Sequence, residues 1–362
     1  MEKTMRCPKC QKVSKFVGNP GETQKITCPF CGIQGKISFE KVEPVSTKTL
    51  VSIEDISKKY KDLLALNNIS FKINKGEVFG YIGPNGAGKT TTIKIMVGLL
   101  RQTSGRLFIN SYSMPEQKEK AHRFIGYMPQ NVAFQQWRTV NHALSTFGKL
   151  SGVDGSILQN RIDGLLNLLN ISQYKNKKIS TLSGGTKQKL GIVQALLHKP
   201  GLLILDEPLE GLDPESRFQV KKIMKELSDK GTTIFFSSHI LSDVEDVANK
   251  ICIIDRGEII KIGTIDEMKS EVSKEHQIEI IFSKKSDKYN EIRKIAGITG
   301  VFEKSFEKIQ VNIEKTGDTD EIIHNIIKTL LKNNCRIRTF NFVSPTLDEV
   351  YQYYLKKGGV KQ

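Results

Sequence analysis

The chain has 362 residues, of which 38% are hydrophobic, and it carries a formal net charge of +16. This length and composition suit a globular protein with a large core and two or three domains, and they exclude a largely disordered chain. No apolar run approaches the roughly 20 residues of a membrane-spanning helix. The first residues lead from Met1 into a cysteine motif without an apolar segment, so we expect a cytoplasmic protein without a signal peptide. The basic excess favours polyanionic partners such as nucleotides, nucleic acid or an acidic lipid surface, although lysines spread over solvated helix faces are the simpler explanation.

Two Cys-x-x-Cys pairs lie near the start of the chain, and seventeen residues separate them. This spacing is typical of a structural site in which four thiolates hold one zinc ion. Disulfides are the rival interpretation, which a cytosolic setting disfavours, and the same thiolates would also accept iron. Metal binding contributes about 10 to 16 kcal/mol to the folding of such modules, which are too small to bury a sufficient core. The predicted ligands of Zn²⁺ are Cys7, Cys10, Cys28 and Cys31.

Composition divides the chain into three predicted domains. Residues 1–46 form the cysteine module, which resembles a zinc ribbon, and residues 43–47 have the composition of a linker. The lysines of the module permit binding to nucleic acid or to protein, and we favour a docking or regulatory role. Residues 47–265 alternate short apolar runs with helix-period stretches, which is typical of a mostly parallel sheet covered by helices.

Residues 266–362 are expected to form a small accessory α+β domain, because strand-like and helix-like segments alternate there. The expected strands are 277–282, 308–313 and 336–342, and the expected helices are 289–296 and 320–333. We find no internal repeat along the chain.

A glycine-rich turn lies between an expected buried strand at 78–82 and an expected helix at 91–97. It matches the phosphate-binding pattern G-x-x-x-x-G-K-[ST] at every position and in the required setting. Glycines let the backbone amides wrap around phosphate oxygens. Lys89 would add a positive charge at the terminal phosphates, and Thr90 is the natural ligand of Mg²⁺. The predicted nucleotide-binding residues of the turn are Gly83, Pro84, Asn85, Gly86, Ala87, Gly88, Lys89, Thr90 and Thr91.

An apolar strand at 202–205 delivers two carboxylates, Asp206 and Glu207, at its carboxyl end. Ligands of open α/β sheets bind at that end of the strands. We expect Asp206 to hold Mg²⁺, directly or through water, and Glu207 to polarise the water that attacks the γ-phosphoryl group. An acidic pair after a strand is also a common helix cap. The phosphate-binding turn favours the catalytic interpretation, because one Mg-nucleotide site needs both halves.

The segment 182–186, Leu-Ser-Gly-Gly-Thr, resembles the signature of the ABC (ATP-binding cassette) family. The family usually has Gln where this chain has Thr186, while Ser183, Gly184 and Gly185, which the family places against the γ-phosphate, are intact. A plain helix start with a Ser cap is the alternative for this pentapeptide. Its position before Asp206 disfavours that alternative.

Four further positions follow the family order. Tyr60 resembles the aromatic that stacks on adenine, although a surface or core tyrosine has the same appearance. Gln130 resembles the glutamine that reaches Mg²⁺ or the attacking water. Asp213, in Gly-Leu-Asp-Pro, resembles the D-loop residue, and His239 resembles the switch histidine that contacts the γ-phosphate. A single histidine after a strand is usually structural, but its order and spacing here favour the functional role.

The resemblance covers about residues 50–265 and implies the fold of a P-loop NTPase of the ABC type. That fold has a mostly parallel core sheet, an antiparallel β subdomain and a helical subdomain. The resemblance also implies an ATPase that works with ATP and Mg²⁺ as a homodimer or heterodimer. In that dimer the signature segment of one subunit completes the nucleotide site of the other. Separate transmembrane permease subunits and a peripheral position on the inner face of the cell membrane follow from the same resemblance.

The closing segment 344–351 resembles that of ATPases serving ABC-2-type exporters, so we expect export of a substrate that the sequence does not identify. An acidic-capped amphipathic helix packing on the last domain would have the same sequence. A soluble ABC ATPase acting on nucleic acid or ribosomes, with the ribbon as reader, is the alternative function. Such proteins usually carry two cassettes or a long coiled-coil insertion, which this sequence lacks. A nucleotide sensor without hydrolysis is disfavoured by Glu207 and His239.

Overall fold

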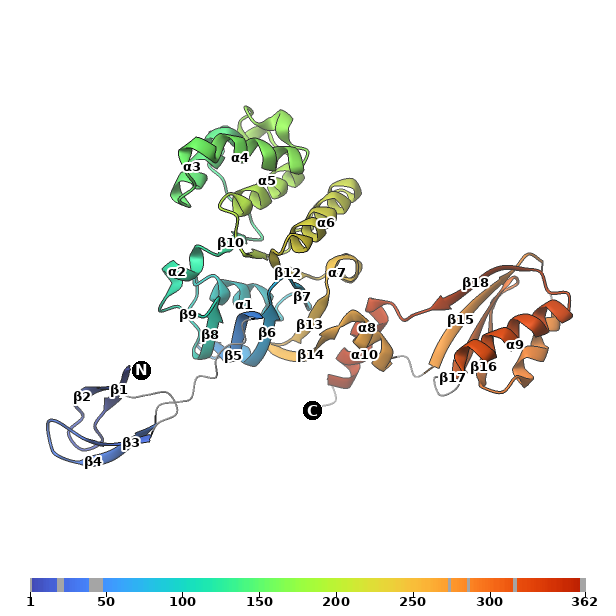
Figure 1. The fold of residues 1–362 in the computed structure, drawn as a ribbon, viewed down its shortest axis with the longest axis horizontal. Coiled ribbons are helices and arrows are strands. Elements are labelled where there is room, and N and C mark those ends of the chain that lie inside the picture. The colour runs from blue at the N-terminus through green and yellow to red at the C-terminus, as the bar shows by residue number, and fades with distance from the viewer. Residues whose placement is uncertain are drawn as a thin grey trace. The chain divides into compact units, whose positions relative to one another are not determined.

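The computed structural model describes residues 2–17, 23–38, 48–272, 275–284, 287–314 and 318–358. The chain forms two compact units, residues 1–48 and 49–362 (Figure 1). This division sets no boundary near residue 265, so the separate C-terminal domain stays a prediction, and the linker predicted at 43–47 lies outside the described residues. Among the described residues, the helices are all too short or too polar to cross a membrane.

The first unit consists of two antiparallel hairpins with the same turn. β1 (Glu2–Arg6) pairs with β2 (Val13–Val17), and β3 (Thr23–Thr27) pairs with β4 (Gln34–Ser38). In the first turn the amide of Cys7 donates to the carbonyl of Lys12 at 2.9 Å, and in the second the amide of Cys28 donates to the carbonyl of Ile33 at 2.9 Å. The two hairpins thus repeat one local structure, although we find no internal repeat in the sequence. Outside the Cys-Pro-x-Cys core the two copies share too few letters to be recognised.

A six-stranded sheet forms the centre of the second unit. Its strand order is β10-β11-β12-β7-β13-β14, in which the first five strands are parallel and β14 is antiparallel. The inner strands are short and apolar on both faces because both faces are covered. The bounds are β7 Val78–Ile82, β10 Ile125–Met128, β11 Leu202–Leu205, β12 Thr233–Ser238, β13 Lys250–Asp255 and β14 Glu258–Thr264.

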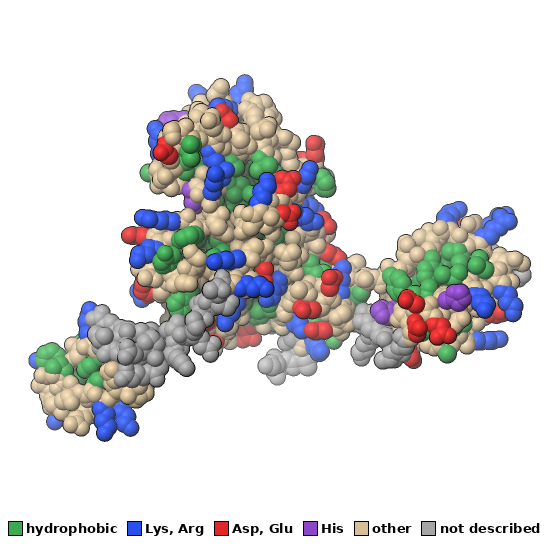
Figure 2. Space-filling model, in the orientation of Figure 1, with side chains coloured by type: hydrophobic (Ala, Val, Ile, Leu, Met, Phe, Trp, Pro, Cys, Tyr) green, Lys and Arg blue, Asp and Glu red, His purple; other side chains and the backbone are tan. Residues whose placement is uncertain are grey.

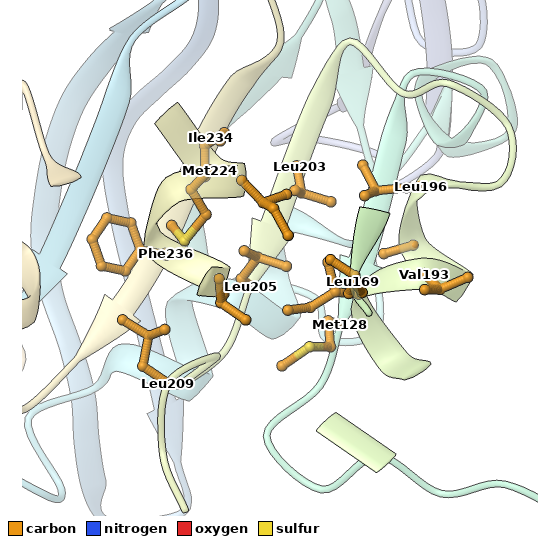
Figure 3. Close-up of a cluster of buried hydrophobic side chains, with 14 of the residues drawn as sticks. Met128, Leu169, Val193, Leu196, Leu203, Leu205, Leu209, Met224, Ile234 and Phe236 are labelled. Carbon is orange, nitrogen blue, oxygen red and sulfur yellow. The ribbon is translucent and has the colours of Figure 1, made fainter. Parts of the chain in front are cut away.

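The two faces of this sheet pack into separate hydrophobic clusters. In β11, Leu203 and Leu205 belong to one cluster, whereas Leu202 and Ile204 belong to the other. Figure 3 shows the first face, where the leucines of β11 meet side chains from the neighbouring strand and from α5 and α6. Removing any of these fully buried leucines would cost about 2 to 5 kcal/mol of stability.

A four-stranded antiparallel sheet covers the other face, with the order β6-β5-β8-β9. Phe71 of this sheet stacks on Phe79 of β7 with ring centroids 5.3 Å apart. Helix α1 (Lys89–Met96) contributes Ile93 and Met96 to the same cluster. The bounds of the strands are β5 Thr49–Tyr60, β6 Leu63–Asn74, β8 Ser104–Ile109 and β9 Tyr112–Met114.

Helices α3, α4 and α5 gather beyond one edge of the central sheet (Figure 1). Asp154 caps α4 through a hydrogen bond from the Ser156 amide, and buried leucines of that helix join the first cluster. The predicted parallel core sheet, antiparallel β subdomain and helical subdomain are thus confirmed. The helices of this unit begin and end as follows: α2 Lys118–His122, α3 Val140–Leu150, α4 Gly155–Leu168, η1 Ser172–Tyr174, η2 Ile179–Thr181, α5 Gly184–Leu196, α6 Pro214–Asp229, α7 Leu241–Val247 and α8 Ile265–Val272.

A second antiparallel sheet, of order β16-β17-β15-β18, follows α8 and has its own hydrophobic cluster with α9 and η3. All three strands expected here are present, and the helix expected at 289–296 is the 3₁₀ helix η3, whereas β16 was not expected. Its turn-rich sequence, Ile-Thr-Gly-Val, hides a strand of which Val301 is buried. The bounds are β15 Glu275–Phe282, η3 Asp287–Lys294, β16 Ile298–Ser305, β17 Lys308–Glu314, α9 Thr319–Lys332 and β18 Ile337–Val343.

The last helix, α10 (Leu347–Gly358), starts with a reciprocal cap. The Glu349 amide donates to Thr346 Oγ1 at 3.3 Å, and the Thr346 amide donates to Glu349 Oε2 at 3.0 Å. An acidic-capped helix, which was the alternative interpretation of segment 344–351, is therefore present. It packs on α7, α8 and β14 and joins the core of the cassette through Leu347 and Val350, whereas that alternative placed it on the last domain.

Basic side chains are spread over the visible surface of residues 49–362 in Figure 2, with acidic ones between them. This distribution agrees with the simpler explanation of the net charge, in which lysines solvate helix and strand faces.

Candidate functional site

A cavity of about 640 Å³ opens at the carboxyl ends of the parallel strands. The glycine-rich turn follows β7, Gln130 lies just beyond β10, and Glu207 lies just beyond β11. The described lining residues are Tyr60, Leu63, Leu64, Ala65, Pro84, Asn85, Gly86, Gly88, Lys89, Thr90, Thr91, Gln130, Glu207 and Arg256. Most of the predicted site residues therefore meet at one place.

Two glycines of the turn are required by its geometry. Gly88 has a φ of 107°, and a Cβ there would lie 2.6 Å from Leu66 Cδ2. A Cβ on Gly83 would lie 2.2 Å from the carbonyl oxygen of Ile254. The turn therefore lies directly against β6 and β13, and any larger residue would push it away from them.

Lys89 is buried and already engaged. Its ammonium group donates to the carbonyl oxygens of Gly83 at 2.8 Å and Pro84 at 3.3 Å, and it lies 3.3 Å from Glu207 Oε1. A cation with these three partners is held in one position within the turn.

Asp206 is buried between two hydroxyl groups. Ser237 Oγ donates to Asp206 Oδ1 at 2.7 Å, and Thr90 Oγ1 lies 3.4 Å from the same oxygen. Burial raises the pKa of Asp206 above its usual value, and the nearby Glu207 charge adds to the effect, while the hydroxyl groups and Lys89 oppose it. Ser237, which belongs to none of the sequence motifs, also accepts a hydrogen bond from the Glu207 amide at 2.9 Å.

Glu207 is held from three sides in a strained conformation. Its φ of 50° is in the left-handed region, which costs a non-glycine residue about 1 to 3 kcal/mol. Glu207 Oε2 lies 3.0 Å from His239 Nδ1, and Gln188 Nε2 donates to the Glu207 carbonyl at 3.1 Å. Strain of this kind concentrates at functional sites because the surroundings fix the side chain in one direction.

Two predicted residues at the rim have other contacts in this structure. Gln130 Nε2 donates to Glu210 Oε2 at 3.0 Å, so Glu210 is a neighbour that the sequence did not indicate. Tyr60 is 42% exposed, and Lys58 Nζ lies 5.1 Å from the centre of its ring. Lys58 in turn donates to the carbonyl of Arg101 at 2.8 Å, which anchors this cation beside the ring.

The signature residues and Asp213 are not among the described residues that line the cavity. Ser183 caps α5 by accepting from the Thr186 amide at 3.2 Å, and Asp213 caps α6 by accepting from the Ser216 amide at 2.9 Å. Gly184 and Gly185 lie in the first turn of α5. The structure thus brings the phosphate-binding turn, the carboxylates and His239 together, and leaves Ser183, Gly184, Gly185 and Asp213 at helix starts elsewhere.

Arg256 is a lining residue that sequence reasoning missed. It lies in the β13–β14 turn, outside every recognised motif. An Asp-Arg-Gly turn between two apolar runs indicates only a hairpin. No local signal in the sequence places this turn beside the cavity.

The four cysteines of the first unit lie with all sulfur atoms within 4.8 Å of one another. Cys7 Sγ is 3.6 Å from Cys31 Sγ, and Cys10 Sγ is 3.7 Å from Cys28 Sγ, too far for disulfides. A tetrahedron with Zn–S bonds of about 2.3 Å has sulfur atoms about 3.8 Å apart. A hydrogen bond from the Cys10 backbone lowers the pKa of Cys7 to about 6. The Ile33 backbone favours the thiolate of Cys31, but burial and the neighbouring thiols raise the pKa of Cys31 to about 11. The geometry therefore fits Zn²⁺.

Comparison with known proteins gives consistent matches. The family model of the ABC transporter matches residues 66–210. An uncharacterised ABC transporter ATP-binding protein, YxlF of Bacillus subtilis, is 42% identical over 222 residues, which cover 61% of this chain and 73% of the relative. The linearmycin resistance ATP-binding protein LnrL of the same organism is 31% identical over 304 residues, which cover 83% of this chain and 97% of the relative.

A solved structure of the ATP-binding subunit of an ABC transporter is 31% identical and superposes with a TM-score of 0.58, covering 62% of this chain and 93% of that structure. The fold and the cavity define a P-loop ATPase with a cassette architecture. The chain belongs to the family of ABC transporter ATP-binding proteins, whose members hydrolyse ATP.

Proposed function

We propose that this chain uses ATP binding and hydrolysis to drive the export of a substrate through separate transmembrane subunits. One observation carries the proposal: Lys89, Asp206, Glu207 and His239 converge, within hydrogen-bonding distance of their neighbours, at the carboxyl ends of three adjacent parallel strands. The membership of the family supports it.

The triphosphate would lie along the glycine-rich turn. Lys89 would exchange its contact with Glu207 for the terminal phosphates, and the amides of Gly86 and Gly88 would bind phosphate oxygens together with the start of α1. Tyr60 would stack on the base at the other end of the cavity.

Mg²⁺ fits the oxygen atoms beside this turn. Thr90 Oγ1 and Asp206 Oδ1, 3.4 Å apart, are the hard donors that this ion prefers, and Gln130 would add a third after leaving Glu210. When bound, the ion neutralises charge on the β- and γ-phosphate oxygens.

Glu207 would act as the general base. Its carboxylate would orient a water molecule towards the γ-phosphoryl group and accept a proton from it. His239, 3.0 Å from Glu207 Oε2, would hold that carboxylate in place and contact the γ-phosphate.

A second ATPase subunit, identical or different, would complete the site. Ser183, Gly184, Gly185 and Asp213 do not line this protomer's own cavity, so they are available at helix starts to approach the nucleotide of a partner. A helix start presents unpaired amides and a positive dipole, which suits a γ-phosphate.

The export direction is supported by the closing segment 344–351 and by the name of LnrL, which refers to resistance. The relatives described above are named as transport or resistance proteins, so an action on nucleic acid or ribosomes is the weaker alternative. We place the protein on the inner face of the cell membrane, bound to its permease, with structural Zn²⁺ in the first unit.

Purification from detergent extracts tests the proposal. We expect the chain to be isolated with a multi-span membrane protein and to hydrolyse ATP with Mg²⁺. Isolation with ribosomes or DNA and without a membrane protein would contradict the transport role. If the chain hydrolysed ATP but was isolated without any partner, its ATPase activity would be supported and its role in transport would not.

A further inference from the structure

The turn between β13 and β14 is a tight hairpin with a defined shape. Arg256 has a φ of 46° and Gly257 has a φ of 80°, so both central residues are left-handed, as in a type I′ turn. A turn of this type holds its two central residues in one conformation, and the side chain of Arg256 is exposed.

This turn is fastened to both ends of the cavity. The Gly257 amide donates to the carbonyl of Ala87 at 3.0 Å, which belongs to the phosphate-binding turn. The Gly257 carbonyl accepts from the Asn67 amide at 2.8 Å, and Asn67 Nδ2 donates to Glu258 Oε1 at 2.6 Å. A Cβ on Gly257 would lie 2.6 Å from the carbonyl oxygen of Ala65, so the turn also lies against the backbone that leads to Tyr60.

Arg256 therefore lies between the phosphate-binding turn and the backbone that leads to Tyr60. Its side chain is 92% exposed and lines the cavity, and Arg256 Nε lies 3.9 Å from Oδ2 of the adjacent Asp255. Among the described lining residues, the positively charged ones are Arg256 and Lys89. Lys89 is buried in the phosphate-binding turn, so Arg256 is the exposed cation among these lining residues.

We propose that the guanidinium group of Arg256 binds the α-phosphate of the bound nucleotide. This inference rests on the proposed nucleotide site and adds a residue to it. In a nucleotide that stacks on Tyr60 and reaches Lys89 with its terminal phosphates, the α-phosphate lies between these ends, beside the β13–β14 turn. A guanidinium group presents a planar set of donors that matches two phosphate oxygens, and the rigid turn reduces the entropy lost on binding.

The test compares Arg256→Gln and Arg256→Lys with the full-length chain. Arg338→Gln, in which an exposed arginine of β18 loses the same charge, is the matched control. Binding of ATP, ADP, AMP and adenosine is measured by competition with a fluorescent nucleotide, extended to millimolar concentrations and at two salt concentrations. Thermal unfolding without nucleotide checks that each variant is folded.

We expect Arg256→Gln to weaken ATP, ADP and AMP alike by about fivefold at low salt, as for an exposed ion pair. Adenosine affinity should stay unchanged, Arg256→Lys should retain part of the affinity, and high salt should reduce the difference. A loss confined to ATP, a loss for adenosine, or no change at all would each overturn the inference. If the unaltered protein failed to bind any of the four, the proposed nucleotide site itself would be refuted.

Discussion

Replacing Glu207 by Gln removes one negative charge and leaves almost the same shape. The amide can still accept a hydrogen bond from His239, whose Nδ1 lies 3.0 Å from Glu207 Oε2. Lys89 loses its 3.3 Å ion pair but keeps the carbonyl groups of Gly83 and Pro84. ATP affinity should therefore be retained or increased, because Lys89 no longer has to leave a carboxylate to reach the phosphates.

Turnover should fall sharply in the same variant. A positioned general base contributes about 10²- to 10⁴-fold to a rate, and Gln cannot accept the proton. The assay is phosphate release with Mg-ATP by the protein as isolated from detergent extracts, alongside equilibrium ATP binding. Glu307→Gln, in the exposed turn before β17, is the control with the same loss of charge. Unchanged hydrolysis would remove Glu207 from the role of base, and loss of ATP binding would show that its main role is to hold the site together.

Three further predictions follow from the geometry. First, the chain should bind about one metal ion tightly, and Cys28→Ser should release the ion and unfold the first unit, because a module of this size needs its metal to fold. Elemental analysis would measure the loss of metal and hydrogen exchange the unfolding, and a variant that retained the metal would contradict the prediction. Second, burial raises the pKa of Asp206, so the folded protein binds the proton of this carboxyl group more tightly than the unfolded chain does. The protein therefore loses stability as the pH rises from the pKa of Asp206 in the unfolded chain to its pKa in the folded protein. Asp206→Asn should therefore raise the melting temperature above that range and abolish Mg²⁺-dependent nucleotide binding, and Mg-nucleotide binding by the unaltered protein should weaken as the pH falls; an unchanged melting temperature at neutral pH would refute the burial argument. Third, Gly88→Ala should cost about 1 to 3 kcal/mol of stability from its φ of 107° alone, and it should also abolish ATP binding because the new Cβ would press on Leu66; a variant that unfolds at the same denaturant concentration as the unaltered protein would contradict this.

The sequence predicts the cassette well because its signals are local. The phosphate-binding turn, the apolar strand before Asp206 and the paired cysteines each combine residue type with short spacing. Parallel strands then bring their carboxyl ends together, so residues distant in sequence meet without any need to foresee individual contacts.

The missed features depend on contacts between distant segments. Ser237 and Glu210 become neighbours of Asp206 and Gln130 only after β12 and the loop beyond β11 are in place. Arg256 approaches the cavity because Gly257 bonds to Ala87, a pairing that no spacing indicates. The similarity of the two hairpins in the first unit is hidden in the sequence, because two hairpins can have the same turn without having the same residues.

Because α10 packs back on the cassette, shortening the carboxyl end of the chain affects the stability of the ATPase core. Leu347 and Val350 fill the core beside α7 and α8, and Tyr354 donates to Glu271 of α8 at 2.6 Å. The β15–β18 sheet is thus inserted between α8 and α10, and both of these helices pack on the cassette. A truncation from the carboxyl end removes α10, and with it part of the ATPase core, before it removes any strand of the β15–β18 sheet. A variant that retains only residues 1–343 should therefore have a lower melting temperature than one from which residues 275–343 alone are excised.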